Sequence, residues 1–246
     1  MCTKNDSCAS QLINALPHIR ALRGKTIVVK YGGNAMINSE LKLAVIEDIV
    51  FMAAVGIKTV LVHGGGPEID LMLKKIGKES SFVNGLRYTD QETMEIVQMV
   101  LCGKVNKDIC VLIEEGGAQA IGICGIDGSL LQARCTKQNE LGLVGEIVKI
   151  ETSLLENILK SGVIPVISPV AIGIDADKGK SLNVNADTAA AKIAAALCAE
   201  KLILITDVRG ILSDVHNPQT LIPFAKRDQL DKLKRRHHLR RHDSKS

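Results

Sequence analysis

Strand-like and helix-like segments alternate along most of this 246-residue chain, and this alternation constrains its fold more than any other feature. Short runs rich in Val, Ile and Thr indicate strands, and longer amphipathic stretches between them indicate helices. Strands are expected at 26–30, 59–63, 163–170 and 201–207, and helices at 40–56, 67–77, 90–102, 104–115, 152–162 and 185–200. Because helices connect successive strands, the pattern predicts an α/β fold with a mainly parallel central sheet.

Some segments after residue 78 predict local antiparallel additions to that sheet. Asn84-Gly85 is a hairpin turn signal, and 120–134 and 141–151 are expected to form strand pairs. The polar segment 173–181, GIDADKGKS, resembles a Walker A phosphate loop, but five residues separate its two glycines where the motif has four. Since no switch from strand to helix surrounds it, this segment is predicted to be a hairpin loop.

Composition and charge argue against several classes of partner. Aromatic residues make up only 2% of the chain, which disfavours base stacking, and no apolar run approaches the roughly 20 residues of a membrane helix. Seven cysteines without a C-x-x-C pair favour a reducing cytoplasm over a disulfide framework or a zinc site. The net charge of +4 comes from residues 226–246, which carry nine Lys or Arg and three Asp. We therefore expect a cytoplasmic protein with no nucleic-acid partner, no membrane and no protein-held metal.

Two glycine clusters follow strand-like runs: Gly32-Gly33 in VVKYGGNAM (28–36) and Gly64 to Gly66 in VLVHGGGPEID (60–70). Ligands of α/β sheets bind beyond the carboxyl ends of strands, where glycine lets the backbone approach closely and free N–H groups bind anions. Lys30 beside the first cluster suits a phosphoryl group. Tight packing turns and a solvated lysine are the alternatives. HGGGP is not G-x-G-x-x-G, so the dinucleotide fingerprint of a dehydrogenase is absent.

Three polar motifs accompany the glycines. Arg87 in NGLRYTD (84–90) is placed to clamp a carboxylate, with a surface ion pair as the alternative. SLNVNADTAA (181–190) brings Asn183, Asn185 and Asp187 to the start of an Ala-rich helix, where spacing alone favours a capping role for Asp187 or Asn185. TDVRGIL (206–212) follows the last strong strand, where a nucleotide base or ribose could lie.

The segments KYGGNAM, VHGGGPEID, NGLRYTD, LNVNADTAA and ITDVRGIL, in this order, resemble the motifs of the amino acid kinase family over about residues 10–225. They are most similar to the members that act on N-acetyl-L-glutamate. The resemblance implies an αβα sandwich with a mainly parallel central sheet. It also implies transfer of the γ-phosphoryl group of ATP to the side-chain carboxylate of N-acetyl-L-glutamate, the second step of arginine biosynthesis. Mg²⁺ is then expected on the ATP phosphates.

The resemblance implies catalytic and nucleotide-binding residues. Lys30 would stabilise the transferring phosphoryl group, and Asp187 would organise the catalytic lysines, which replaces the capping interpretation. Gly32 and Gly33 would form the turn over the phosphates. The nucleotide-binding turn is expected to comprise Asp207, Val208, Arg209, Gly210, Ile211 and Leu212.

Substrate-binding residues are implied in the same way. Gly65 and Gly66 would present backbone N–H groups to the substrate and the transition state. Arg87 would clamp the α-carboxylate of the substrate, and Asn183 would contact it. A carboxylate acceptor is ionised at neutral pH, so its attack on a phosphoryl group needs no general base, and positioning with cationic and N–H donors is sufficient.

The resemblance also divides the chain into regions. Residues 1–24 are similar to the N-terminal helix of the arginine-inhibited hexameric members, with a simple packed helix as the alternative. We therefore expect a homo-oligomer, a dimer or a hexamer, with arginine as a feedback inhibitor. Residues 25–170 are expected to form the N-acetylglutamate-binding lobe, 171–230 a partial ATP-binding lobe and 231–246 an aberrant basic tail.

The basic tail is the one departure from the family pattern. Family members continue with a G-G-M-I-P-K-like motif, whereas RHHLRRHDSKS (236–246) permits codons that encode GIISGGMIPK when read one nucleotide later. This predicts a frameshift near 233–236, a nucleotide lobe that lacks its C-terminal part, and impaired activity. Two alternatives remain: another family member, acting on carbamate, aspartate, glutamate or UMP, or a non-catalytic amino-acid-binding or sensing module.

Overall fold

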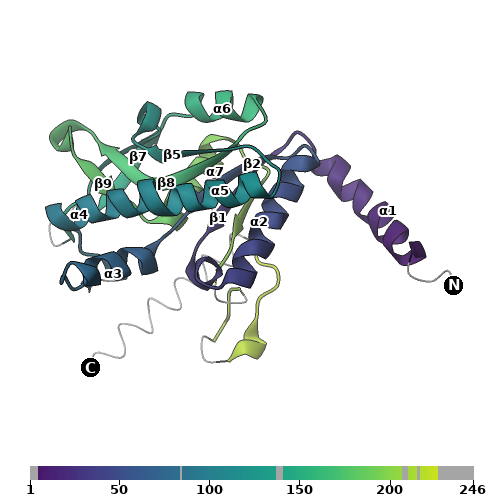
Figure 1. Ribbon diagram of the computed structural model, residues 1–246, viewed down its shortest axis with the longest axis horizontal. Helices are drawn as coiled ribbons and strands as arrows, with labels where there is room; N and C mark the ends of the chain where they lie inside the picture. Colours follow the sequence, from purple (N-terminus) through teal and green to yellow (C-terminus); the bar gives the residue numbers. More distant parts are fainter. Residues whose placement is uncertain (1–4, 84, 137–140, 207–209, 215–216, 227–246) are drawn as a thin grey trace. The chain divides into compact units, whose positions relative to one another are not determined.

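The computed structural model describes residues 5–83, 85–136, 141–206, 210–214 and 217–226. Within them, eight strands form one sheet in the order β10-β1-β2-β8-β6-β7, with β5 and β9 also paired to β8 (Figure 1). The strands are β1 (Thr26–Tyr31), β2 (Lys58–His63), β5 (Ala120–Gly125), β6 (Leu131–Cys135), β7 (Gly145–Ile150), β8 (Ile164–Gly173), β9 (Ser181–Asn183) and β10 (Lys201–Leu204). A separate hairpin joins β3 (Phe82–Val83) to β4 (Leu86–Arg87).

Most strand pairs of this sheet are parallel, as the sequence predicts. β1 pairs in parallel with β10 and β2, and β8 pairs in parallel with β2, β5 and β6. The β6–β7 and β8–β9 pairs are antiparallel, and the second of these confirms that 173–181 is a hairpin loop. The strand pair expected within 120–134 is wrong, because β5 and β6 each pair with β8. Residue periodicity indicates a strand but does not identify its partner.

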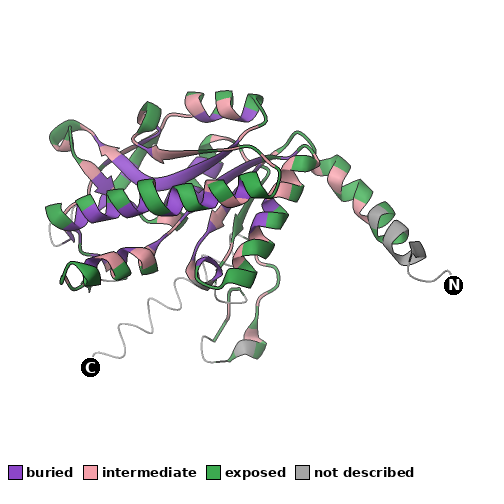
Figure 2. Cartoon of the chain, viewed as in Figure 1, coloured by how far each residue is buried: buried purple, intermediate pink, exposed green. Residues whose placement is uncertain are grey.

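Helices cover both faces of the sheet, which confirms the predicted αβα sandwich (Figure 1). One face packs against α2 (Ser39–Ala54), α3 (Gly66–Lys75), α4 (Gln91–Gln98) and α5 (Asn106–Glu115). The other packs against α6 (Ser153–Lys160) and α7 (Ala186–Ala196). Alternate residues of β1 enter opposite cores: Ile27 and Val29 lie in the first, and Val28 in the second. Figure 2 shows the resulting buried strands between helices with exposed outer faces.

The helices expected at 90–102 and 104–115 are joined by a π-helical segment, Met99–Val105, into one continuous helical run. At its end the backbone N–H of Asn106 donates to the carbonyl of Leu101, five residues earlier. Such π segments commonly occur at functional sites. Here the segment packs Leu101 and Val105 beside Gly65, at the beginning of α3.

The chain comprises two compact units, Met1–Ile205 and Thr206–Ser246. In the second unit, Leu212 bridges Leu221, and a 3₁₀ turn spans Pro218–Thr220. The lobe boundary expected after residue 170 falls inside β8, and the division into two binding lobes stays a prediction. The tail at 231–246 and the frameshift near 233–236 lie outside the described residues. Among the described residues, no helix has the length and apolar character needed to cross a membrane.

Candidate active site

The two glycine clusters lie side by side at the carboxyl ends of β1 and β2. The parallel register pairs Tyr31 with His63, and the N–H of Gly64 donates to the Tyr31 carbonyl at 2.8 Å. Gly33 has a positive φ of 68° and begins a short 3₁₀ turn, a conformation that favours glycine. The sheet therefore brings together the two motifs that the sequence singled out separately.

A cavity of about 200 Å³ opens beside the second cluster. Its lining includes all four residues predicted to bind the substrate: Gly65, Gly66, Arg87 and Asn183. No described residue accepts a hydrogen bond from the backbone N–H of Gly65 or Gly66, which stand where α3 begins. Free N–H groups at a helix N-terminus attract anions, so this cavity suits a small acidic ligand.

Arg87 reaches the cavity from β4 and is only 8% exposed. Its Nη1 donates to Asp70 Oδ1 at 2.6 Å and to Ser80 Oγ at 2.7 Å, and its guanidinium carbon lies 4.7 Å from the centroid of the Phe82 ring. Partial burial raises the pKa of Asp70, but the hydrogen bonds from Arg87 and Ser80 outweigh that effect, so the pKa of this carboxyl is lowered. The ion pair joins a buried guanidinium to a carboxylate whose side chain is 45% exposed, and it holds the guanidinium in place.

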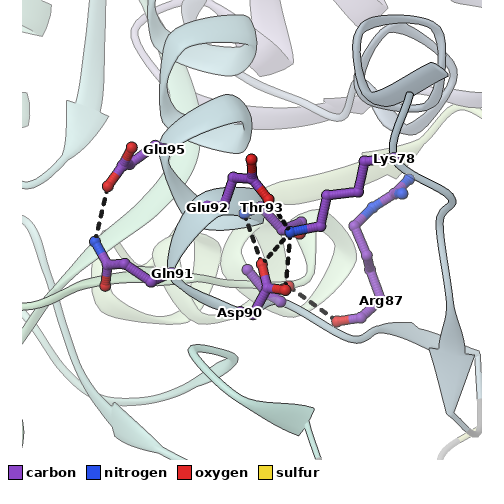
Figure 3. Close-up of polar contacts among 8 residues, drawn as sticks. Lys78, Arg87, Asp90, Gln91, Glu92, Thr93 and Glu95 are labelled. Atoms are coloured by element: carbon purple, nitrogen blue, oxygen red, sulfur yellow. Dashed lines mark hydrogen bonds and ion pairs between the residues drawn. The ribbon is translucent and has the colours of Figure 1, made fainter. Parts of the chain in front are cut away.

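A charged cluster holds the hairpin that carries Arg87 (Figure 3). Asp90 caps α4 by accepting from the N–H of Thr93 at 2.8 Å. Lys78 precedes the hairpin in the chain, and its Nζ donates to Asp90 at 2.7 Å and to Glu92 at 2.7 Å. The Lys78 hydrogen bond is the main cause that lowers the pKa of Asp90 to about 2. Residues on either side of the hairpin are thereby tied together.

Lys30 and Asp187 form an ion pair with 3.1 Å between Nζ and Oδ1. The N-cap of α7 is Asn185, whose side chain accepts from the N–H of Thr188 at 2.9 Å, so Asp187 is left to pair with Lys30. A Cβ on Gly32 would lie 2.7 Å from Lys30 Nζ, so glycine there leaves room for the ammonium group. The contact joins the first glycine cluster to the helix that follows Asn183.

The predicted nucleotide turn is described only in part. Asp207, Val208 and Arg209 lie outside the described residues, and Gly210, Ile211 and Leu212 belong to the second unit. Their nucleotide-binding role therefore stays a prediction. Among the described residues, no cluster of three or more His, Cys, Asp or Glu side chains is suited to hold a metal ion.

Sequence reasoning missed a buried polar network beneath the second glycine cluster. His63, Asn106 and Ser168 are each 0% exposed. His63 Nδ1 lies 2.7 Å from the Gly64 carbonyl, and its Nε2 lies 3.2 Å from Asn106 Nδ2 and 3.0 Å from Ser168 Oγ. Burial lowers the pKa of His63 to about 4, so the ring is neutral at pH 7. His63 is part of the HGGGP motif, but its partners come from distant segments that sequence spacing does not connect.

The chain is similar to known proteins over most of its length. The model of the amino acid kinase family matches residues 25–244. Acetylglutamate kinase of Clostridium beijerinckii is 54% identical over 226 residues, which cover 92% of this chain and 79% of that protein. The enzyme of the same name from Thermoanaerobacter pseudethanolicus is 55% identical over 87% of this chain and 71% of its own length.

One solved structure that is similar to this chain contains bound ligands. The N-acetylglutamate synthase of Neisseria gonorrhoeae, complexed with coenzyme A and N-acetyl-glutamate, superposes with a TM-score of 0.70 at 27% identity. The match covers 83% of this chain and 46% of the synthase chain.

Proposed function

The chain belongs to the amino acid kinase family, and from that premise we propose that it transfers the γ-phosphoryl group of ATP to the side-chain carboxylate of N-acetyl-L-glutamate. The observation that carries the proposal is the small cavity in which a buried arginine, an asparagine amide and two free backbone N–H groups converge. The similarity to acetylglutamate kinases over about nine-tenths of the chain supports the same substrate.

The acceptor is held by groups that match its chemistry. Arg87 lines the cavity and provides a buried cation, whose Nη2 donates to the Gly66 carbonyl at 3.3 Å. A guanidinium can bind a carboxylate through two parallel hydrogen bonds. Asn183, held by a hydrogen bond of 3.2 Å to Thr89 Oγ1, presents an amide to the same cavity. These contacts suit a small molecule that carries both a carboxylate and polar uncharged groups.

Phosphoryl transfer between two anions requires stabilisation of charge and accurate positioning. Among the described residues, the N–H groups of Gly65 and Gly66 and the ammonium of Lys30 are donors suited to this task, and Asp187 holds Lys30 in place. The acceptor carboxylate is already ionised and attacks without a general base. ATP supplies the phosphoryl group, and Mg²⁺ bound to its phosphates would neutralise part of their charge. Binding of the nucleotide is assigned to the segment 207–212, on the resemblance of this segment to the family motif.

A trapping assay tests this function directly. Incubation with ATP, Mg²⁺ and hydroxylamine should convert N-acetyl-L-glutamate to its hydroxamate through an acyl phosphate. Aspartate and glutamate under the same conditions, and carbamate and UMP followed through ADP release, should give little or no turnover. Preferential turnover of one of these acceptors would assign another activity of the family. Acceptor binding by calorimetry without any turnover would support a non-catalytic binding module.

The assembly and regulation of the protein are part of the same proposal. Helix α1 (Asn5–Leu22) exposes Ile13, at 68% exposed, and Leu16, at 41%, and such apolar positions suit packing against another subunit. We expect a homo-oligomer, dimer or hexamer, whose activity arginine inhibits. Sedimentation of the wild-type protein and of Ile13→Ser/Leu16→Ser should differ in mass if α1 joins subunits, and equal masses would argue for a simple packed helix.

A further inference from the structure

The carbonyl of Gly64 is fixed by a buried side chain. His63 Nδ1 lies 2.7 Å from this carbonyl oxygen, which can only accept, so the neutral ring carries its proton on Nδ1. His63 is 0% exposed and is the last residue of β2, which lies between β1 and β8 in the sheet. The carbonyl is therefore turned toward the interior of the protein.

The Gly65 N–H belongs to the same peptide unit as the Gly64 carbonyl and must point away from the protein interior. The 64–65 peptide bond is trans, so the Gly64 carbonyl and the Gly65 N–H point in opposite directions. Gly65 lines the cavity, and no described residue accepts its N–H. A carbonyl drawn toward His63 consequently directs this free N–H toward the cavity.

The histidine ring is itself held from two sides. Its unprotonated Nε2 accepts from Asn106 Nδ2 at 3.2 Å, and Asn106 Nδ2 also donates to the Val166 carbonyl at 2.9 Å. Ser168 Oγ lies 3.0 Å from both Nε2 and the Leu101 carbonyl oxygen, and its single proton is donated to one of these two acceptors. The Leu101 carbonyl accepts the N–H of Asn106 at the end of the π-helical segment. Strand β8 and the π-helical segment thus lock the ring in one orientation.

We propose that His63, supported by Asn106, is a positioning residue that aims the Gly65 N–H at the phosphoryl group during transfer. The inference rests on the proposed function, because it assigns the direction of one donor in that reaction. His63 does not touch the substrate, and its neutral ring supplies no charge. Its contribution is to keep the 64–65 peptide from rotating, so that the donor needs no reorganisation in the transition state.

Two substitutions separate positioning from simple packing. His63→Asn retains an N–H at the same distance from the backbone as Nδ1, and His63→Leu retains bulk without a donor, while both lose the present contact with Asn106. We expect His63→Leu to lower kcat about 10²-fold with an unchanged KM for N-acetyl-L-glutamate, and His63→Asn to recover most of kcat. Thr59→Val, a change at a residue that is 2% exposed near the other end of β2, should leave kcat unchanged. Equal losses in both His63 variants, or none in His63→Leu, would overturn the proposal.

A measurement on the ligand-free protein keeps this test separate from the proposed function. The amide ¹H–¹⁵N resonance of Gly65 should move in His63→Leu and stay near its wild-type position in His63→Asn, while that of Gly77, just beyond the C-terminal end of α3, stays in place. A wild-type protein that phosphorylates no acceptor would refute the proposed function, and the Gly65 resonances would still decide whether His63 orients this peptide. Unchanged Gly65 resonances in both variants would refute the positioning role.

Discussion

Acidification should destabilise this protein through His63, a side chain that folding removes from water. The pKa of His63 is lowered by burial to about 4, whereas an imidazole in an unfolded chain titrates near 6.5. Between these values the unfolded chain binds a proton that the folded protein does not, so the free energy of unfolding falls as the pH falls. A shift from 6.5 to about 4, at about 1.4 kcal/mol for each tenfold change in proton affinity, amounts to about 3 kcal/mol. This contribution is fully present above pH 6.5 and is lost by about pH 4.

Urea unfolding measured from pH 8 to pH 4 tests this value, with His63→Asn as the non-titrating comparison. Carboxyl groups titrate in both proteins, so the difference between their stability curves isolates the histidine. The wild type should lose about 3 kcal/mol more than the variant over this range. His18→Asn, at an exposed position of α1, should follow the wild-type curve. Parallel curves for the wild type and His63→Asn, or an NMR titration of the His63 ring near pH 6.5, would refute the reasoning.

Four further substitutions test the candidate site. Gly65→Ala should cost about 1–3 kcal/mol in urea unfolding, because its Cβ would lie 2.5 Å from Leu101 Cδ2, whereas Gly66→Ala, whose Cβ would meet only Arg87 Nη2 at 3.9 Å, should stay within about 0.5 kcal/mol of the wild type. Equal losses would contradict this packing argument. Arg87→Lys replaces a planar fork by a point charge, so calorimetry should show acceptor affinity lowered by about 1.5–3 kcal/mol, and unchanged affinity would remove Arg87 from the site. Lys30→Met should lower kcat about 10²–10³-fold with a normal acceptor KM, and a loss confined to KM would assign Lys30 to binding instead.

Local sequence patterns were sufficient for much of the fold. The runs at 26–30 and 59–63 and the helix at 40–56 agree with β1, β2 and α2 to within about two residues, since β-branched runs and helical periodicity act over short distances. The glycine clusters were likewise visible, because a close backbone approach leaves a direct mark in the residue type. The π-helical segment was not predicted, and its contacts with Gly65 and Ser168 join segments that sequence periodicity does not connect.

Sequence alone determined the layered α/β architecture and the residue types available for binding an anion, because both depend on short-range pattern. Only the tertiary structure decided which of those residues meet. It placed Arg87 against Asp70 and Ser80, paired Lys30 with Asp187, and enclosed His63 with Ser168, a residue 105 positions away. Contacts between distant segments depend on how strands pair and helices pack, and hydrogen-bond demand in the interior then selects the partners.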